Sequence, residues 1–342
     1  NSNFWSEYTD SWVDVRDGTP VANIVSLESD VFNVGSMIEF SGYGDDIDGF
    51  ITSYRWVSSF EGLISEEPTF ATNTLTIGIH EIYFFVRDND NQWSLSDNIT
   101  LRINSYPEIS KINWDRSESF RYENVTLSGE IYDMEDSISD ISFELEYRNS
   151  LESEFWAPYN TSFAEMDETM FSTIFVADST FDSIYYDFRI IATDSDNATT
   201  IFYYNQSLKI NNKAPVIMEM FFSKDFVNET ELLYIYGNYE DDVLVIAHEW
   251  SSNIHQGILS NNETVAVNTL APGMHQITYR VFDNEGFSSE LVSSIRVNGI
   301  PRVESLMLSS EIVLEGESIE IDYFVFDDLG IIEYDWIQKN PR

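Results

Sequence analysis

The chain has 342 residues, 43% of them hydrophobic and 15% aromatic, and is therefore long enough to bury several cores of ordinary domain size. Its 60 acidic and 17 basic side chains give a formal net charge of −43, which repels nucleic-acid phosphates and anionic lipid headgroups and argues against both as partners. Cysteine is absent, which excludes disulfides, thiolate metal sites and cysteine nucleophiles, and no apolar stretch approaches the roughly 18 residues of a membrane helix.

Residues typical of β-strands occur in short alternating runs throughout the chain, and Asn, Asp, Ser and Gly separate these runs. Heptads and long runs of helical period are missing from the sequence. The sequence therefore predicts an all-β chain of tandem immunoglobulin-like antiparallel β-sandwich domains in a row.

A proline marks each short linker of the predicted repeat, in "GTPVANI", "SYPEISKI", "KAPVIMEM" and "GIPRVESL". These prolines are 87, 108 and 86 residues apart, a spacing that suits immunoglobulin-sized sandwiches. We expect complete domains over residues 19–105, 106–212 and 213–299, the middle one with longer loops.

The two ends of the chain carry parts of the same repeat. The segment "NFWSEYTDSWVDVRDGTP" at 3–20 matches "NQWSLSDNITLRINSYP" at 91–107, so residues 1–18 are expected to form the C-terminal strands of a preceding domain. Residues 300–342 match the first half of a unit and are expected to form the N-terminal half of a further domain. On this interpretation the chain is a segment of a longer repeat protein.

Residues 20–56, "PVANIVSLESDVFNVGSMIEFSGYGDDIDGFITSYRW", resemble the first half of a polycystin-type PKD domain, with its Pro-x-Ala start, Asp-x-Asp-Gly turn and Ile-x-x-Tyr-x-Trp strand. "GIHEIYFFVRDNDNQWS" resembles the second half. "WVSSFEG" stands where that family has Trp-Asp-Phe-Gly-Asp-Gly, so the domains are described as PKD-like. The resemblance implies seven-stranded extracellular sandwiches of archaeal or bacterial surface proteins, used as spacer, adhesive or structural modules.

Two histidines recur at the start of the predicted strand F. His80 and His275 stand eight residues before the aspartate that ends this strand, and Tyr186 takes the same place in the middle unit. This is the position of the tyrosine corner, where a polar ring atom bonds backbone upstream. Because a tyrosine can replace them, we interpret these histidines as structural rather than as metal ligands or general bases.

Acidic residues recur in the predicted B–C and F–G loops, which meet at one end of an immunoglobulin-like sandwich. Since Ca²⁺ takes six to eight oxygen ligands, acids from both loops are candidates to surround a cation near each domain junction. The alternative is that these residues stand there because Asp and Asn favour turns. The candidate calcium ligands are Asp45, Asp46, Asp48, Asp88, Asp90, Asp133, Asp136, Asp194, Asp196, Asp241, Asp242 and Asp283.

Asparagines in sequons and several tryptophans are further candidates for a functional role. Seven Asn-x-Ser/Thr sequons make candidate glycosylation sites of Asn98, Asn124, Asn160, Asn197, Asn205, Asn228 and Asn262. The predicted strand C ends on a core aromatic residue, which is Trp56, Tyr147, Trp250 or Trp336 in successive units. Trp5 and Trp93 take matching F–G positions and are candidates for interdomain or partner contact.

The acids recur on turn positions in every unit, which is not the arrangement of a glycosidase carboxylate pair, and the sequence predicts no enzyme. The leading hypothesis is a structural repeat segment of a long extracellular surface protein, an S-layer or surface-filament subunit. Its partners would be copies of itself in a lattice or filament, and glycans. The alternatives are an adhesin or carbohydrate-binding stalk and the accessory region of a secreted hydrolase. The acidic composition suits a saline exterior, where salt screens self-repulsion.

Overall fold

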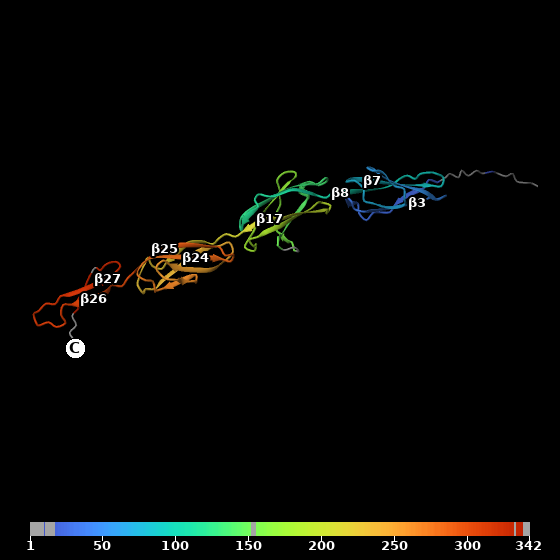
Figure 1. Ribbon diagram of the computed structural model, residues 1–342. Coiled ribbons are helices and arrows are strands. Elements are labelled where there is room, and N and C mark those ends of the chain that lie inside the picture. Colours follow the sequence, from blue (N-terminus) through green and yellow to red (C-terminus); the bar gives the residue numbers. More distant parts are fainter. Residues whose placement is uncertain (1–9, 11–17, 152–154, 332, 338–342) are drawn as a thin grey trace, which may run out of the picture. The chain divides into compact units, whose positions relative to one another are not determined.

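The computed structural model describes residues 10, 18–151, 155–331 and 333–337 (Figure 1). The strands predicted within residues 1–18 therefore lie outside the described residues, apart from Asp10 and Gly18. Contacts group the chain into two compact units. The first contains Asn1–Ser117, Asn124–Phe175 and Tyr185–Leu208, and the second contains Glu118–Glu123, Val176–Ile184 and Lys209–Arg342. Within the described residues, no helix is long and apolar enough to cross a membrane.

The first unit begins with a sandwich of two sheets. One sheet has the order β1-β3-β6, with strands β1 Val21–Ile24, β3 Ile38–Asp45 and β6 Thr69–Thr72. The facing sheet has the order β2-β8-β7-β4-β5, with strands β2 Val31–Asn33, β4 Ile51–Ser58, β5 Gly62–Ser65, β7 Gly78–Asp88 and β8 Asp97–Asn104. Neighbouring strands pair antiparallel, except that β2 pairs in parallel with β8.

The alternation of residues along β7 explains the core of this sandwich. His80, Ile82, Phe84 and Val86 are buried and the residues between them are more exposed, because successive side chains of a strand point to opposite faces. Trp56 packs against Phe84 with 4.2 Å between ring centroids. Burying side chains of this size contributes about 1.5 to 3 kcal/mol each, so this inward row is a main source of stability.

The first unit also contains most of a second sandwich. One sheet has the order β14-β15-β11-β9, with strands β9 Glu108–Trp114, β11 Asn124–Tyr132, β14 Ala164–Glu165 and β15 Met170–Val176. The other has the order β17-β16-β12-β13, with strands β12 Ser142–Asn149, β13 Ala157–Tyr159, β16 Tyr185–Thr193 and β17 Thr199–Asn211. A single turn of 3-10 helix, η1 (Ile138–Asp140), precedes β12.

The buried tryptophan of the second sandwich does not come from strand C. Trp114, on β9, is 4% exposed and packs edge-on against Phe188 with 4.9 Å between ring centroids. Its indole N–H donates to Oγ of Ser207 over 3.0 Å. Tyr147, expected to take this place from β12, is only half-buried. Here β9, rather than strand C, supplies the large buried ring. The second unit therefore lacks the tryptophan that ends strand C in the first and third units.

The second unit holds the third sandwich and β10 (Glu118–Phe120), which pairs in parallel with the Lys209–Asn211 end of β17. One sheet has the order β18-β20-β23, with strands β18 Val216–Phe222, β20 Leu233–Glu240 and β23 Thr264–Val267. The facing sheet has the order β19-β25-β24-β21-β22, with strands β19 Phe226–Asn228, β21 Val245–Ser252, β22 Ile258–Ser260, β24 Gly273–Asp283 and β25 Ser288–Asn298.

The core of the third sandwich repeats that of the first. Trp250 stacks on Tyr279 with 3.9 Å between ring centroids, and both rings are fully buried. The indole N–H of Trp250 donates to the carbonyl of Asn262 over 3.0 Å, as that of Trp56 does to the carbonyl of Glu67. A buried polar atom is thereby satisfied. The prediction that Trp56 and Trp250 are core residues is confirmed.

A glycine beneath an aromatic ring recurs in all three sandwiches. A Cβ added to Gly42 or Gly237 would lie 2.5 Å from the ring of Phe84 or 2.4 Å from that of Tyr279. At Gly129 it would lie 2.7 Å from the ring of Phe171. These distances leave no room for a side chain, so the strand that precedes the acidic B–C loop carries a glycine for packing reasons.

Residues 300–337 contain a two-stranded antiparallel sheet, β26 (Arg302–Leu308) and β27 (Ile321–Phe326). No second sheet faces it among the described residues, and Trp336, expected in a core, is 54% exposed and packs only against Tyr323 on one side. Three pairs of facing sheets precede this segment, and they confirm the predicted all-β fold of antiparallel sandwiches.

Candidate functional site

In each sandwich, the aspartate at the end of strand F (β7, β16 or β24) accepts hydrogen bonds from the backbone of the F–G loop that follows. Oδ1 of Asp88 accepts hydrogen bonds from the backbone N–H groups of Asp90 (2.9 Å) and Gln92 (2.8 Å). Asp194 and Asp283 hold the N–H groups two and four residues further on in the same way. All three aspartates are at most 5% exposed. One carboxylate oxygen of each aspartate thus accepts hydrogen bonds from its own loop, as expected of Asp in a turn.

The second oxygen of two of these aspartates binds an asparagine of a linker. Nδ2 of Asn104 donates to Oδ2 of Asp194 over 2.9 Å within the first unit, and Nδ2 of Asn212 donates to Oδ2 of Asp283 over 2.7 Å within the second. Both asparagines stand three residues before a linker proline, as does Asn298. This Asn-x-x-Pro recurrence is a sequence signal that identifies the linker asparagines.

Backbone amides of the linkers bind acids of the B–C loops. The residue two before each linker proline donates its N–H to a carboxylate about 30 residues further along the chain. The four pairs are Gly18 with Asp48 (2.8 Å), Ser105 with Glu135 (3.3 Å), Lys213 with Asp242 (3.3 Å) and Gly299 with Asp328 (2.7 Å). The same contact therefore recurs at all four linkers.

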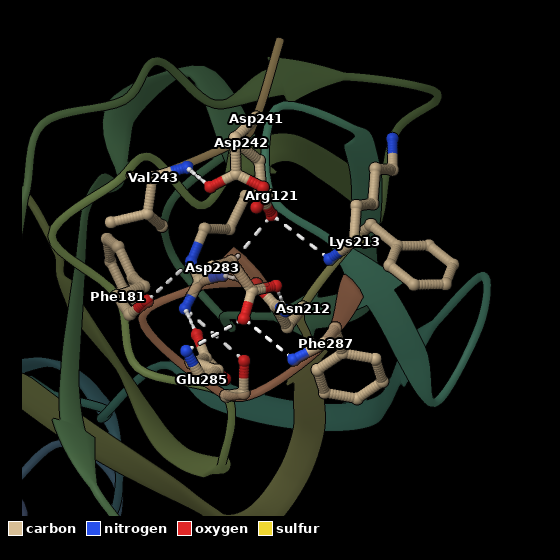
Figure 2. Close-up of polar contacts among 12 residues, drawn as sticks. Arg121, Phe181, Asn212, Lys213, Asp241, Asp242, Val243, Asp283, Glu285 and Phe287 are labelled. Carbon is tan, nitrogen blue, oxygen red and sulfur yellow. Dashed lines mark hydrogen bonds and ion pairs between the residues drawn. The ribbon is translucent and has the colours of Figure 1, made fainter. Parts of the chain in front are cut away.

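Arg121 lies at the centre of a polar cluster in the second unit (Figure 2). Its side chain is 2% exposed and makes ion pairs with Asp242 (3.2 Å) and Glu285 (2.5 Å). Further hydrogen bonds run to the carbonyl of Phe181 (2.8 Å) and to Oδ1 of Asn212 (2.9 Å). Burial alone would lower the pKa of Arg121, but the hydrogen bonds that it donates to Glu285 and Asp242 raise the pKa above its ordinary value. The cluster thus holds a permanent buried charge.

Two other arginines pair with loop acids. Arg102 binds Asp196 in the first unit, and Arg296 binds Asp328 over 3.1 Å in the second. Both stand five residues before a linker proline. Arg121 instead follows β10, so the linker pattern gives no signal for it.

The candidate calcium ligands are distributed over these contacts. Loop N–H groups, linker amides or arginines bind Asp48, Asp88, Asp133, Asp136, Asp194, Asp196, Asp241, Asp242 and Asp283. Asp45 accepts a hydrogen bond from Asn23 (3.4 Å), and Asp90 accepts one from Asn89 (2.8 Å). Within the described ranges, no group of three or more His, Asp or Glu side chains is arranged to hold a metal ion. Calcium binding stays a prediction.

One carboxylate oxygen of the B–C loop remains without a partner in several units. Burial, and then the neighbouring carboxylates of Asp48 and Asp88, raise the pKa of Asp46, and its Oδ1 is buried and unpaired. In the second sandwich, Oγ of Ser105 lies 3.3 Å from Oδ2 of Asp133. Linkers without a serine at this position leave unpaired oxygens on Asp46, Asp241 and Asp327.

The recurring histidines are buried and bound to backbone. Nε2 of His80 lies 2.7 Å from the carbonyl of Thr76, and Nε2 of His275 lies 2.7 Å from the carbonyl of Ala271. A carbonyl only accepts, so Nε2 carries the proton in both rings. This geometry agrees with their interpretation as corner residues. All seven sequon asparagines, at 98, 124, 160, 197, 205, 228 and 262, are exposed.

Paired sheets joined by B–C and F–G loops define the chain as a protein of tandem immunoglobulin-like β-sandwiches. No family model and no curated protein matches the chain. Among solved structures it is similar to the I-band fragment I67–I69 of titin, with 11% identity over 82% of this chain and 99% of that one (TM-score 0.43). It is also similar to the mouse nectin-like molecule 4 ectodomain, with 13% identity over 78% and 96% (TM-score 0.33). For the insect immune protein hemolin, identity is 13% over 84% and 79% (TM-score 0.31).

Proposed function

We propose that the chain is a structural segment of an extracellular surface protein of archaeal or bacterial origin, built from PKD-like sandwiches and serving in an S-layer or surface filament. The observation that carries this proposal is the recurrence, at four linkers, of a hydrogen bond from the linker amide to a B–C loop acid. No catalytic step is part of the proposal.

The physical argument concerns the linkers. A linker of Gly and Ser behaves as a flexible coil, whereas here both the backbone amide and the preceding asparagine side chain are bonded to loops of a sandwich. Each bond must be broken before the linker can change conformation, and at Arg121 a buried ion pair must be broken too. Restrained linkers suit a load-bearing or spacing role.

The surface supports an exterior location. The net charge of −43 keeps the chain soluble in salt, where screening reduces the repulsion between copies in a lattice or filament. The seven exposed sequon asparagines are accessible to glycosylation. The first sandwich is the proposed place for calcium, because the carboxylates of Asp48 and Asp88 repel that of Asp46 there, and a cation would relieve this repulsion once the loop closes around it.

Hydrogen–deuterium exchange of the full chain tests the restrained linkers. We expect the amides of Ser105, Lys213 and Gly299 to exchange more slowly than those of an unstructured peptide. Asp242→Asn should accelerate exchange at Lys213 and leave Ser105 unchanged, which makes the latter an internal control. If all the linker amides exchange at the unstructured rate, the spacer function is wrong. Electron microscopy in salt then separates the finer roles, since an ordered lattice or filament favours the surface-layer role over an adhesin stalk.

A further inference from the structure

A tryptophan between two arginines lies on the outer surface of the first sandwich. Cζ of Arg55, on β4, is 4.5 Å from the ring centroid of Trp93, and Cζ of Arg87, on β7, is 5.5 Å from it. Each distance is that of a cation–π contact. The three side chains line one surface cavity, and Trp93 holds both guanidinium groups in place beside it.

The two arginines lack an acidic partner among the described residues. In the described part of the chain, no ion pair joins Arg55 or Arg87 to a carboxylate, although the sequence has 60 acids. Nε of Arg87 is buried without a hydrogen-bond partner, and its Nη2 reaches only Oγ of Ser53, at 3.5 Å. The buried and unpaired Nε–H of Arg87 costs free energy that an external acceptor would recover, whereas Arg55 is exposed.

A similar trio in the second sandwich provides an internal comparison. Arg148 and Arg189 lie over Trp156 with 4.5 Å and 4.9 Å from Cζ to the ring centroid. There each arginine has its own acid: Arg148 binds Asp187 over 2.9 Å, and Arg189 binds Glu146. The chain therefore neutralises such a trio internally in one sandwich and leaves it open in the other.

The cavity beside the open trio is lined by both cationic and acidic side chains. It has a volume of about 430 Å³, and its lining includes Arg55, Arg87 and Trp93 together with Glu66 and Glu67. The glutamates make no ion pair with either arginine, so the cavity offers cationic donors and anionic acceptors at once. A ligand that satisfies both carries a carboxylate as well as hydroxyl donors.

From this geometry we propose that the cavity binds an acidic sugar unit, a uronic acid within a glycan. The carboxylate of the sugar accepts hydrogen bonds from the guanidinium groups of Arg55 and Arg87, and its ring hydroxyls donate to Glu66 and Glu67. A simple anion would meet repulsion from the glutamates, and a neutral sugar would leave the arginines unpaired. This binding is independent of the proposed spacer function, which rests on the linkers.

Calorimetric titration of the full chain with a galacturonic acid trisaccharide tests the proposal. We expect binding at low salt, at least tenfold weaker binding for the fully methyl-esterified trisaccharide, and at least tenfold weaker binding for the double variant Arg55→Gln with Arg87→Gln. The control double variant, Arg280→Gln with Lys224→Gln, removes the same charge at exposed ion pairs in the third sandwich and should bind within twofold of the original chain. Circular dichroism melting checks that each variant is folded.

Three outcomes overturn the proposal: no binding of the acidic trisaccharide, equal binding of its methyl ester, or unchanged binding by the folded Arg55 and Arg87 variant. Sedimentation velocity distinguishes another source of the carboxylate. If the original chain self-associates, the variant does not, and the trisaccharide fails to compete, then the occupant is an acidic side chain of a second copy and the sugar proposal is wrong.

Discussion

Nδ2 of Asn212 lies 2.7 Å from Oδ2 of Asp283, while Oδ1 of the same asparagine accepts a hydrogen bond from Arg121 over 2.9 Å. One linker amide thereby connects a buried cation to a buried anion that itself braces the F–G loop. In a low-dielectric setting such bonds strengthen one another, and losing one member leaves the others unsatisfied. The first predictions follow from this network.

Arg121→Met should destabilise the second unit by about 3 to 5 kcal/mol, because it leaves the largely covered carboxylate of Asp242, and the more exposed one of Glu285, without their cation. Urea unfolding followed by tryptophan fluorescence measures the change. Arg280→Met is the matched control, since its pair with Glu290 is exposed to solvent and should contribute little to stability. Similar losses for the two variants would contradict the role of Arg121.

Asn212→Ala should cost about 1 to 3 kcal/mol, because Oδ2 of Asp283 then stays buried without a donor. The neighbouring Asn211→Ala removes only an exposed bond to Glu118 and should change unfolding by a few tenths of a kcal/mol. Thermal melting of both variants separates them. Equal melting temperatures would show that the hydrogen bond from Asn212 to Asp283 does not stabilise the fold.

Gly237→Ala should destabilise the third sandwich by about 1 to 3 kcal/mol, since the new methyl group would lie 2.4 Å from the ring of Tyr279. Asn238→Ala, at the next and exposed position of β20, is the control and should be nearly neutral. Denaturation curves measure both. A neutral effect of Gly237→Ala would mean that Tyr279 can shift without cost.

The first sandwich should lose stability on acidification through Glu61. Burial alone would raise the pKa of this carboxyl, but hydrogen bonds from Ser58 and Thr76, with the His80 charge, lower it to about 2. Because the folded pKa lies below the unfolded value of about 4.5, the stabilisation is complete above pH 4.5 and disappears as the pH falls towards 2. Melting from pH 6 to pH 2 should show a smaller decline for Glu61→Gln than for Glu39→Gln, an exposed control. If the melting temperatures of the two variants fall equally with pH, Glu61 is not the cause of the acid sensitivity.

Calcium at millimolar concentration should raise the thermal midpoint of the full chain if a cation relieves the repulsion among Asp46, Asp48 and Asp88. Asp46→Asn should abolish this rise and also raise stability in the absence of calcium, since it removes one of the repelling charges. Magnesium at equal ionic strength controls for screening. An unchanged midpoint with calcium would end the calcium hypothesis.

The sequence predicted those parts of the fold that depend on residues close together along the chain. Alternation identified the inward row of β7, and the exchange of Tyr186 for histidine identified His80 and His275 as corner residues. The strand carrying the core tryptophan of the second sandwich was not predictable. Trp114 and Phe188 meet across two sheets, and either of two strands can supply a ring of that size.

The sequence by itself determined an all-β fold and the acidity of its loops, because strand alternation and turn chemistry are local properties. Only the tertiary structure decided what those acids bind. Arg121 meets Asp242 and Glu285 from 121 and 164 residues away, and no local spacing encodes such a pairing. Likewise, the arginines beside Trp156 pair with acids, whereas those beside Trp93 pair with none that the structure describes, because the outcome depends on which side chains neighbouring strands bring into register.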